Sequence, residues 1–305
     1  MRSAHDLLQH GLILADGAMG TYYAQLAGVQ AVACEMANIS DPGLIRRIHQ
    51  EYLAAGARLL RTNTFAAAAV YGNSDPDSLR ASVRAGYELA VECAGGLAYV
   101  AADIGPVYHL ESSDALEASR ITVETLLDAG AHLFLFETFA DPEELLPLCR
   151  LVRSRVPDAV IIASFALSAD GYSRKGIPLL QISEIMEASP EIDIWGFNCG
   201  IGPTHFAEQL RRLPARGKPL TLMPNSGYPR QENQRLVFGS SPDYFASATA
   251  GLAIDRIRLI GGCCGTSPQH IRALRTVLDR IELPVQSAAE VNVKEIQLKV
   301  PSFGR

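Results

Sequence analysis

Eight short apolar runs, separated by longer stretches with helical spacing, constrain the fold of this 305-residue chain most strongly. The runs are residues 12–16, 58–62, 98–104, 132–137, 160–167, 193–198, 220–224 and 256–262. Several are apolar almost without alternation, as strands buried on both faces of a parallel sheet are. The segments between them, such as 44–56 and 120–130, repeat apolar residues at helical intervals. The pattern therefore predicts eight strand–helix units.

Capping residues and glycines mark the ends of the predicted helices. A helix start is favoured where Asp or Ser precedes Pro, because the first side chain caps the helix and proline lacks an N–H that the first turn would leave unpaired. Such pairs occur at Asp41-Pro42, Asp141-Pro142, Ser241-Pro242 and Ser267-Pro268. Helix ends with a left-handed residue are expected at Gly56, Gly130 and Gly251.

Eight such units, with no linker or low-complexity segment between them, predict an α/β protein that folds as a single (β/α)8 TIM-type barrel over residues 1–284. An open doubly wound sheet is the alternative, which periodicity alone does not exclude, although the count of eight favours closure. Residues 285–305 contain no ninth unit. We expect them to form a C-terminal extension packed on the barrel or a linker to a further segment.

Charge and hydropathy exclude several classes of partner. The formal net charge is −6 and no Lys/Arg cluster stands out, so we expect no nucleic-acid partner. The N-terminal segment carries Asp6 and two histidines where a signal peptide needs an apolar stretch. No segment approaches the ~20 apolar residues of a membrane span. We therefore expect a cytoplasmic protein without a membrane partner.

Polar residues follow most of the predicted strands. The segments are "ADGAMGT" (15–21), "TNTF" (62–65), "FET" (136–138), "FNCG" (197–200), "MPNSG" (223–227) and "GGCCGT" (261–266). Because the reactive face of a (β/α)8 barrel lies at the C-terminal ends of its strands, these residues are the candidates for chemistry.

Three cysteines are predicted to converge at this face. Cys199 follows the sixth run, and Cys263 and Cys264 follow the eighth. Three thiolates that leave a fourth position open are typical of a catalytic zinc site, since structural sites close with four protein ligands. Two adjacent cysteines alone also fit small core residues or a strained disulfide with a redox role. The third cysteine, two units away, favours metal binding.

The remaining cysteines and histidines give no such pattern. Cys34 is expected in a loop, and Cys93 and Cys149 in helices, all as structural residues. The histidines show no spacing that supports a metal site; those considered are His49, His109, His132, His205 and His270.

Two acidic residues accompany the cysteines at the predicted strand ends. Asp16 and Glu137 are each expected to bond loop N–H groups if they stand alone, but together on this face they indicate a site for a substrate ammonium group. The glycines of segment 15–21 turn the chain and also expose backbone N–H groups that can bind a carboxylate. The segment lacks the lysine of a phosphate loop and the full dinucleotide pattern. The combination indicates an amino-acid binding site.

Taken together, the six polar segments resemble the homocysteine-binding methyltransferase family, over roughly residues 8–282. The resemblance implies a zinc ion held by Cys199, Cys263 and Cys264. It also implies an anchor for the homocysteine amino group at Asp16 and Glu137, and backbone amides around Gly17 and Ala18 for its carboxylate. Asn225 resembles a residue that approaches the zinc in some members when substrate is absent.

The activity that the resemblance implies is a zinc-dependent homocysteine S-methyltransferase. A methyl group would pass to the zinc-bound homocysteine thiolate, giving methionine, since zinc coordination removes the thiol proton. The donor is either a sulfonium (S-methylmethionine or S-adenosylmethionine) or methylcobalamin on a separate corrinoid protein, with betaine as a third choice. Three segments, "TNTF", "PNSGYP" and "GSSPDYFA" (239–246), resemble the cobalamin-linked synthases and the homocysteine domains fused to methylenetetrahydrofolate reductase more than the plant-type S-methylmethionine enzymes. A non-catalytic zinc-binding barrel and a thiol-redox barrel are the alternatives from other classes.

Overall fold

The computed structural model describes residues 4–9, 11–29, 33–72, 75–108, 112–232, 235–254 and 256–281. The predicted extension 285–305 and His109 lie outside the described residues.

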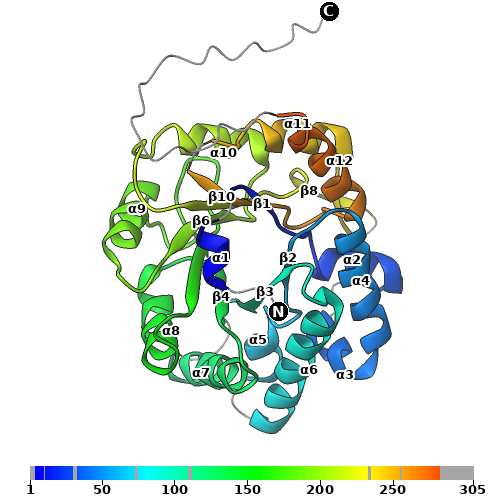
Figure 1. Cartoon of the computed structure of the whole chain (residues 1–305), viewed down its shortest axis with the longest axis vertical. Coiled ribbons are helices and arrows are strands. Elements are labelled where there is room, and N and C mark those ends of the chain that lie inside the picture. Colours follow the sequence, from blue (N-terminus) through cyan, green and yellow to red (C-terminus); the bar gives the residue numbers. More distant parts are fainter. Residues whose placement is uncertain are drawn as a thin grey trace, which may run out of the picture.

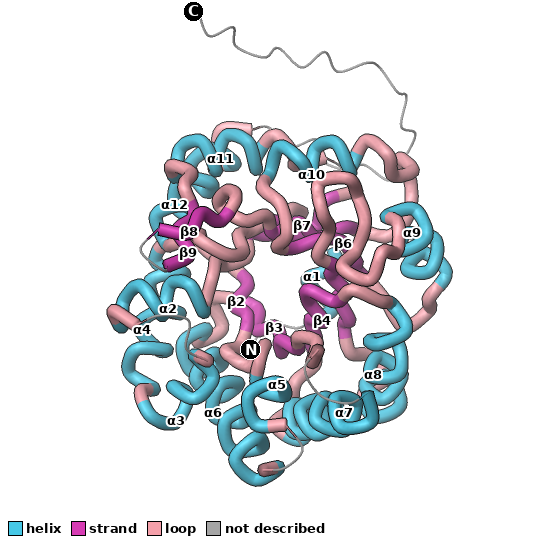
Figure 2. The backbone as a smooth tube through the Cα atoms, turned by 180° about the vertical axis from the view of Figure 1, so that it is seen from behind, coloured by secondary structure: helices cyan, strands magenta, loops and turns pink. Residues whose placement is uncertain are grey.

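Eight parallel strands form a closed barrel surrounded by helices, as predicted (Figures 1 and 2). The strands are β1 (Ile13–Leu14), β2 (Leu59–Arg61), β3 (Tyr99–Ile104), β4 (Leu133–Phe139), β5 (Val160–Phe165), β6 (Ile194–Asn198), β7 (Leu220–Met223) and β10 (Ile257–Ile260). Their order around the sheet is β1-β10-β7-β6-β5-β4-β3-β2. A parallel bridge between Ala15 and Leu59 joins β1 to β2 and closes the ring, which excludes the open doubly wound sheet.

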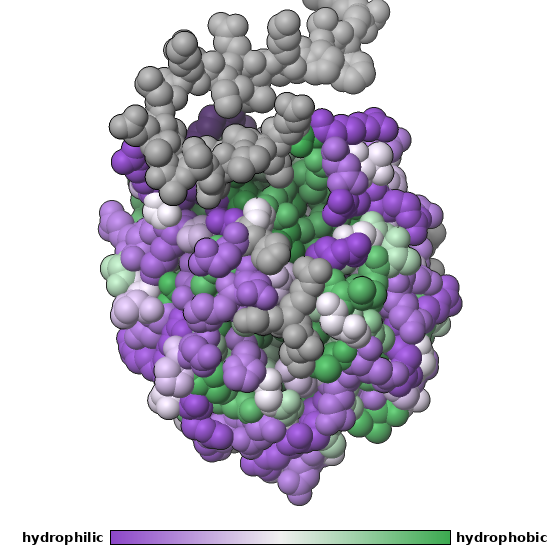
Figure 3. Space-filling view, in the orientation of Figure 1, coloured by the Kyte–Doolittle hydropathy of each residue, from purple (hydrophilic) through white to green (hydrophobic). Residues whose placement is uncertain are grey.

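Helices lie around the outside of the barrel and at its N-terminal end. They are α1 (Ala4–Gln9), α2 (Gly20–Ala27), η1 (Cys34–Met36), α3 (Ala37–Ser40), α4 (Pro42–Ala54), α5 (Ala67–Tyr71), α6 (Pro76–Ala94), α7 (Ser112–Asp128), α8 (Pro142–Arg155), α9 (Leu179–Ala188), α10 (Pro203–Leu210), α11 (Pro242–Ala250) and α12 (Pro268–Leu278). Hydrophilic residues cover much of the face in Figure 3. Among the described residues, no helix combines the length and apolar character needed to cross a bilayer.

The predicted helix starts are confirmed at all four Asp-Pro and Ser-Pro pairs. The side chains of Asp41, Asp141 and Ser241 accept hydrogen bonds from backbone N–H groups in the first turns of α4, α8 and α11. Ser267 forms a capping box with His270 at the start of α12.

Two of the three predicted left-handed glycines are confirmed. Gly56 and Gly130 have φ angles of 105° and 86°. The prediction for Gly251 is wrong, because its φ is −64°. Its N–H donates to Ser247 O, so the chain leaves α11 through a right-handed turn that needs no special residue.

The apolar core has two layers. The larger layer lies between the strands and the outer helices. The smaller one fills the barrel and is built mainly from the first residues of the strands, together with Ala15 and Met223 nearer their C-terminal ends, and Leu7 of α1 packs against it. Helix α1 therefore covers the N-terminal end of the barrel, and in Figures 1 and 2 it lies within the ring of strands. The opposite end is left for the polar loops.

A hairpin that the sequence patterns did not predict lies on this polar side. Strands β8 (Pro229–Glu232) and β9 (Arg235–Phe238) pair antiparallel between β7 and α11. Phe238, at the end of β9, lines the cavity described below.

Candidate active site

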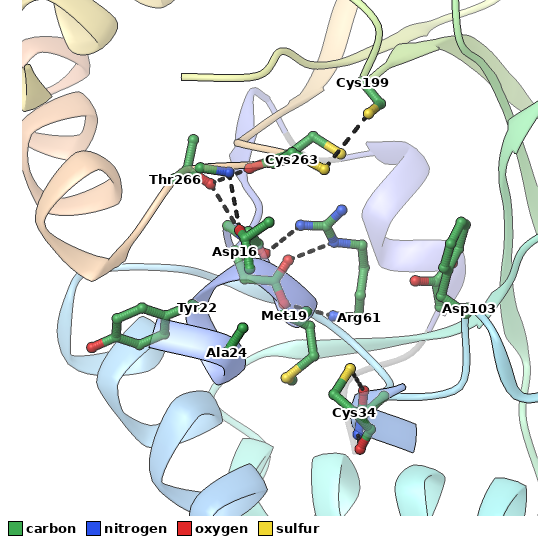
Figure 4. A pocket seen from close by; sticks show the side chains of 18 of the residues that line it. Asp16, Met19, Tyr22, Ala24, Cys34, Arg61, Asp103, Cys199, Cys263 and Thr266 are labelled. Carbon is green, nitrogen blue, oxygen red and sulfur yellow. Dashed lines mark hydrogen bonds and ion pairs between the residues drawn. The ribbon is translucent and has the colours of Figure 1, made fainter. Parts of the chain in front are cut away.

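A cavity of about 1010 Å³ opens at the C-terminal ends of the strands. Most of the residues predicted for the site line it: Asp16, Gly17, Ala18, Glu137, Cys199, Cys263 and Cys264. Asn225 does not line the cavity, but it is buried and its side chain hydrogen-bonds Cys199. The structure therefore brings together residues that lie up to 248 positions apart in the chain. Figure 4 shows the cavity with the cysteines and Asp16 on neighbouring walls.

The three cysteines of the predicted metal site form one cluster, with their Sγ atoms all within 4.8 Å of one another. Cys199 Sγ lies 3.7 Å from Cys264 Sγ, and all three are free thiols. In the part of the chain that the structure describes, this is the group of three or more His, Cys, Asp or Glu side chains that could hold a metal ion.

Backbone geometry directs Cys199 into the cluster. Its φ is 57°, a left-handed conformation that non-glycine residues adopt uncommonly and that is concentrated at functional sites. The Cys199 N–H donates to Met223 O at 3.1 Å, so the turn is held by the neighbouring strand.

The loop after β10 is fixed by hydrogen bonds to the loops after β7 and β1 and by one bond within itself. Cys263 N–H donates to Pro224 O at 2.8 Å, and Ser226 N–H donates to Cys264 O at 3.0 Å. Thr266 Oγ1 donates to Cys263 O at 2.7 Å and accepts from the Ala18 N–H at 3.0 Å. The adjacent cysteines are thus positioned by backbone contacts rather than by their own packing.

The donor set fits a thiophilic metal ion. Hydrogen bonds from Cys263 and Cys264 lower the pKa of Cys199 to about 3, while the bond with Cys199 raises the pKa of Cys263 to about 12. One thiol of the cluster therefore loses its proton readily, and the resulting negative charge makes the remaining thiols harder to deprotonate. A divalent cation offsets that charge, and three sulfurs are ligands that Zn²⁺ prefers. Asn225 Oδ1, buried and without a hydrogen-bond partner, adds a polar oxygen beside Cys199.

A buried arginine that the sequence analysis missed connects the predicted acidic residues. Arg61 Nε lies 2.7 Å from Asp16 Oδ1, and Arg61 Nη1 lies 3.1 Å from Glu137 Oε2. The Arg61 backbone N–H donates to Asp16 Oδ2 at 2.9 Å. Its Nη2 donates to the carbonyl oxygens of Gly17 and Gly262, so one guanidinium joins the ends of β1, β2, β4 and β10. The only signal in the sequence was a charge at the end of an apolar run.

Asp103 is a second acidic residue that the sequence patterns did not single out. It lies near the end of β3, lines the cavity and is 3% exposed. Burial raises its pKa well above the usual value, and the neighbouring Glu137 raises it further. Burial also raises the pKa of Asp16 and Glu137, against the opposing effect of Arg61.

Asn198, within the "FNCG" segment, connects the acidic group to the cysteines. Its Nδ2 donates to Thr138 Oγ1 at 2.7 Å and lies 3.4 Å from Glu137 Oε2 and 3.8 Å from Cys263 Sγ. Its Oδ1 accepts from Ser164 Oγ and the Thr138 N–H. The buried amide of Asn198 therefore fixes the position of the Glu137 carboxylate relative to the Cys263 sulfur.

The glycine segment after β1 leads into α2 at the cavity wall. A Cβ atom on Gly17 would lie 2.7 Å from Thr266 Oγ1 and 2.8 Å from Tyr52 Oη, so only glycine fits there. The Ala18 N–H, predicted to meet a carboxylate, is already bonded to Thr266. The first N–H groups of α2 follow directly and also line the cavity.

Two of the three other cysteines lie in the elements predicted for them, and the third does not. Cys93 and Cys149 lie in α6 and α8, as predicted. Cys34 is not in an irregular loop but begins the short helix η1, because its Sγ donates to Asn63 Oδ1 at 3.0 Å and ties that turn to the cavity wall. None of the described histidines lines the cavity.

Comparison with known proteins gives one consistent result. The model of the family described as homocysteine S-methyltransferase matches residues 13–278. The homocysteine S-methyltransferase of Escherichia coli is 30% identical over 87% of this chain and 94% of its own length. The methionine synthases of Mycobacterium tuberculosis and Mycobacterium leprae are 28% and 29% identical. The chain spans about a quarter of the length of these two, 27% and 25%.

Solved structures agree with the sequence comparison. The metallated form of the homocysteine methyltransferase MmuM from Escherichia coli superposes with a TM-score of 0.70 at 25% identity, over 90% of this chain and 98% of that one. The apo form of the same protein gives a TM-score of 0.66 at 27% identity, over 88% and 96%. By its sequence and its fold, this chain belongs to the homocysteine S-methyltransferase family of methyltransferases.

Proposed function

We propose that the protein transfers a methyl group to the sulfur of homocysteine and so forms methionine. The observation that carries the proposal is the placement of the three-sulfur cluster and a buried acidic group on one cavity. Homocysteine has a thiol at one end and an amino-acid group at the other. The cysteine cluster is suited to the thiol, and the buried acidic group is suited to the ammonium of the amino-acid end. Asn198 contacts both Glu137 and Cys263, so it positions the ammonium-binding group relative to the thiol-binding group.

Cys199, Cys263 and Cys264 are the proposed ligands of a zinc ion, with Asn225 beside them. When bound, zinc supplies the positive charge that allows a substrate thiol to lose its proton at neutral pH. The metallated form of MmuM supports a metal in a protein of this family.

The amino-acid end of homocysteine is proposed to bind at the acidic group and the glycine segment. Asp16 and Glu137 contribute negative charge for the ammonium group. The backbone around Gly17 and Ala18 faces the substrate carboxylate, and the first N–H groups of α2 add donors where the Ala18 N–H is already used.

The proposed methyl donor is a small sulfonium that enters the same cavity. A volume of about 1010 Å³ is more than homocysteine fills. Phe65 and Phe238 line the space, and aromatic faces attract cations. Among the described lining residues, Arg61 is the one cationic side chain, and its guanidinium is occupied by carboxylates, so the described lining offers no free positive charge to an anionic donor.

The transfer itself requires positioning more than proton movement. The homocysteine sulfur attacks the donor methyl carbon while the methyl–sulfonium bond breaks, and a neutral thioether leaves. The buried walls hold the two molecules in line and keep water away from the reacting atoms. We further propose that residues 1–284 form one homocysteine-binding barrel and residues 285–305 an extension or linker.

Methionine formation from L-homocysteine tests the proposal, with S-methylmethionine and methylcobalamin each supplied as the sole donor to the zinc-loaded protein. We expect turnover with S-methylmethionine. Turnover with methylcobalamin only would instead indicate a separate corrinoid protein as the partner, which is the alternative donor that the sequence patterns left open. No methionine from either donor would overturn the proposed activity.

Replacing the ligands tests the metal site. Cys263→Ser and Cys264→Ser are each expected to lower the zinc-to-protein ratio and to abolish turnover, because two sulfurs remain of three. Cys93→Ser is the matched control, since Cys93 lies half-buried in α6, contacts Arg46 O and is not part of the cluster. Zinc retained at the wild-type ratio in both cluster variants would contradict the assignment.

A further inference from the structure

Asp103 stands out in the cavity as a buried carboxyl group with an oxygen that nothing satisfies. Asp103 Oδ1 has no hydrogen-bond partner among the described residues, and its side chain is 3% exposed. Backbone contacts hold it there, because the Asp103 N–H donates to Thr62 Oγ1 at 2.9 Å and Asp103 O accepts from Thr64 Oγ1. Buried polar groups are nearly always paired, so an orphaned carboxyl oxygen on a cavity wall indicates a ligand.

Asp16, by contrast, has both oxygens occupied. Its Oδ1 accepts from Arg61 Nε at 2.7 Å and its Oδ2 from the Arg61 N–H at 2.9 Å. An ammonium group that bound Asp16 directly would compete with a bidentate contact that is buried on both sides. Figure 4 shows Arg61 between Asp16 and Asp103 in that view.

We propose that the substrate ammonium group binds between Asp103 and Glu137, and that Asp16 contributes through Arg61 rather than by direct contact. The inference rests on the proposed function and names two carboxylates that share the ammonium. Glu137 keeps the place that the sequence predicted for it, and Asp103 is added.

The charges of the surrounding groups explain why this pair suits an ammonium. The titratable and charged groups near Asp103 include Glu137, Arg61 and Asp16, and the Cys34 thiol of η1. Arg61 balances one of the two ionised carboxylates, Asp16 and Glu137, and burial beside Glu137 favours the protonated form of Asp103. In the proposed ligand-free state, the Asp103 oxygen other than Oδ1 holds this proton and donates it to Glu137, while Oδ1 stays without a partner.

Binding the ammonium replaces that proton. The hydrogen bond between the Asp103 carboxyl and the Glu137 carboxylate breaks, the proton goes to solvent, and the ammonium donates to both carboxylates. The net charge of the group, ligand included, is the same before and after, so binding adds no further uncompensated charge to the buried site.

Calorimetry with two ligands tests the proposal without a methyl donor: L-homocysteine and 4-sulfanylbutanoate, which lacks only the ammonium group. We expect Asp103→Asn in the zinc-loaded protein to weaken homocysteine binding by about 10-fold to 150-fold, the range for a lost hydrogen bond to a charged group. Binding of 4-sulfanylbutanoate should change by less than about 2-fold. An equal loss for both ligands, or no loss for homocysteine, would overturn the proposal.

Asp193→Asn is the matched control. Asp193 lies just before β6, at the opposite end of the barrel, where it pairs with Arg153. Removing its charge should leave the ratio of the two affinities unchanged. A ratio altered to the same degree as in Asp103→Asn would show a general effect of charge removal and would also count against the proposal.

The wild-type protein supplies a second measurement that does not depend on a variant's folding. Calorimetry at pH 7 in buffers with different ionisation enthalpies counts the protons released on binding. Both ligands lose a thiol proton, so homocysteine should release about one proton more, the one displaced from Asp103. No difference would refute the displacement. Homocysteine that failed to bind at all would instead refute the proposed function.

Discussion

Single residues account for what the sequence could and could not predict about the site. The three cysteines come just after their strands and Glu137 lies near the C-terminal end of β4, so the rule that chemistry lies at the C-terminal ends of barrel strands predicted their convergence. Arg61 and Asp103 belong to the strands themselves, inside apolar runs. Whether such a side chain points into the barrel mouth depends on strand register and tilt, which periodicity does not supply.

Arg61 is expected to be a large contributor to stability because it is buried between two carboxylates. Arg61→Met removes the cation and leaves Asp16 and Glu137 facing each other without compensation, at a cost of about 3–5 kcal/mol in the free energy of unfolding. Arg61→Lys, which keeps the charge but not the fork, should lose less. Urea unfolding of the three proteins measures the difference.

An exposed ion pair provides the comparison for Arg61. Arg46 contacts Glu92 at 3.0 Å, but the two side chains are 36% and 61% exposed to solvent. Arg46→Met should therefore leave the unfolding midpoint almost unchanged. If Arg61→Met were as mild as Arg46→Met, the buried network would not stabilise the fold, and its role would be confined to the substrate.

For the helices and strands, the apolar runs and the capping residues were the most informative features of the sequence. All eight apolar runs became strands, and all four proline-containing starts became capped helices. The β8–β9 hairpin lacked a two-residue glycine turn between apolar alternations, so no hairpin signal was present. Helix α1 is only six residues long, too short for helical periodicity to be detected.

Helix α4 contains a titratable group that makes its packing depend on pH. Both nitrogens of His49 lack hydrogen-bond partners within the described structure, and burial lowers its pKa from 6.5 to about 4. The unfolded chain binds this proton more readily, so stability falls as the pH drops below about 6.5 toward 4. Between pH 7.5 and pH 5, about 2 kcal/mol should be lost through this residue.

Comparing the wild type with His49→Leu isolates the contribution from other titrating groups. The free energy of unfolding in urea, measured at pH 7.5 and pH 5, should fall less for the variant than for the wild type, by about 2 kcal/mol. The same pH dependence in both proteins would mean that His49 titrates alike in the folded and unfolded states.

In the whole molecule, one end of the barrel contributes mainly to stability and the other end carries the groups for chemistry. The cavity, the cysteines and the acidic group lie at the C-terminal ends of the strands, and the inner apolar layer lies at the other end under α1. Substitutions at the covered end should therefore change unfolding without changing ligand binding. The family match begins at residue 13, so α1 precedes the part of the chain that the family model covers.

Leu7 is where this separation is most directly tested. Its side chain is fully buried and packs on the inner layer, so Leu7→Ala should cost about 2–5 kcal/mol in unfolding free energy, as a cavity in a core does. Leu180→Ala, at a position 45% exposed in α9, should stay within about 0.5 kcal/mol of the wild type. Homocysteine affinity should be the same in both variants and the wild type at temperatures where all three are folded. A loss of affinity in Leu7→Ala under those conditions would mean that packing beneath the barrel reaches the site, because the strands that α1 covers also carry Arg61, Asp103 and Glu137 at their other ends.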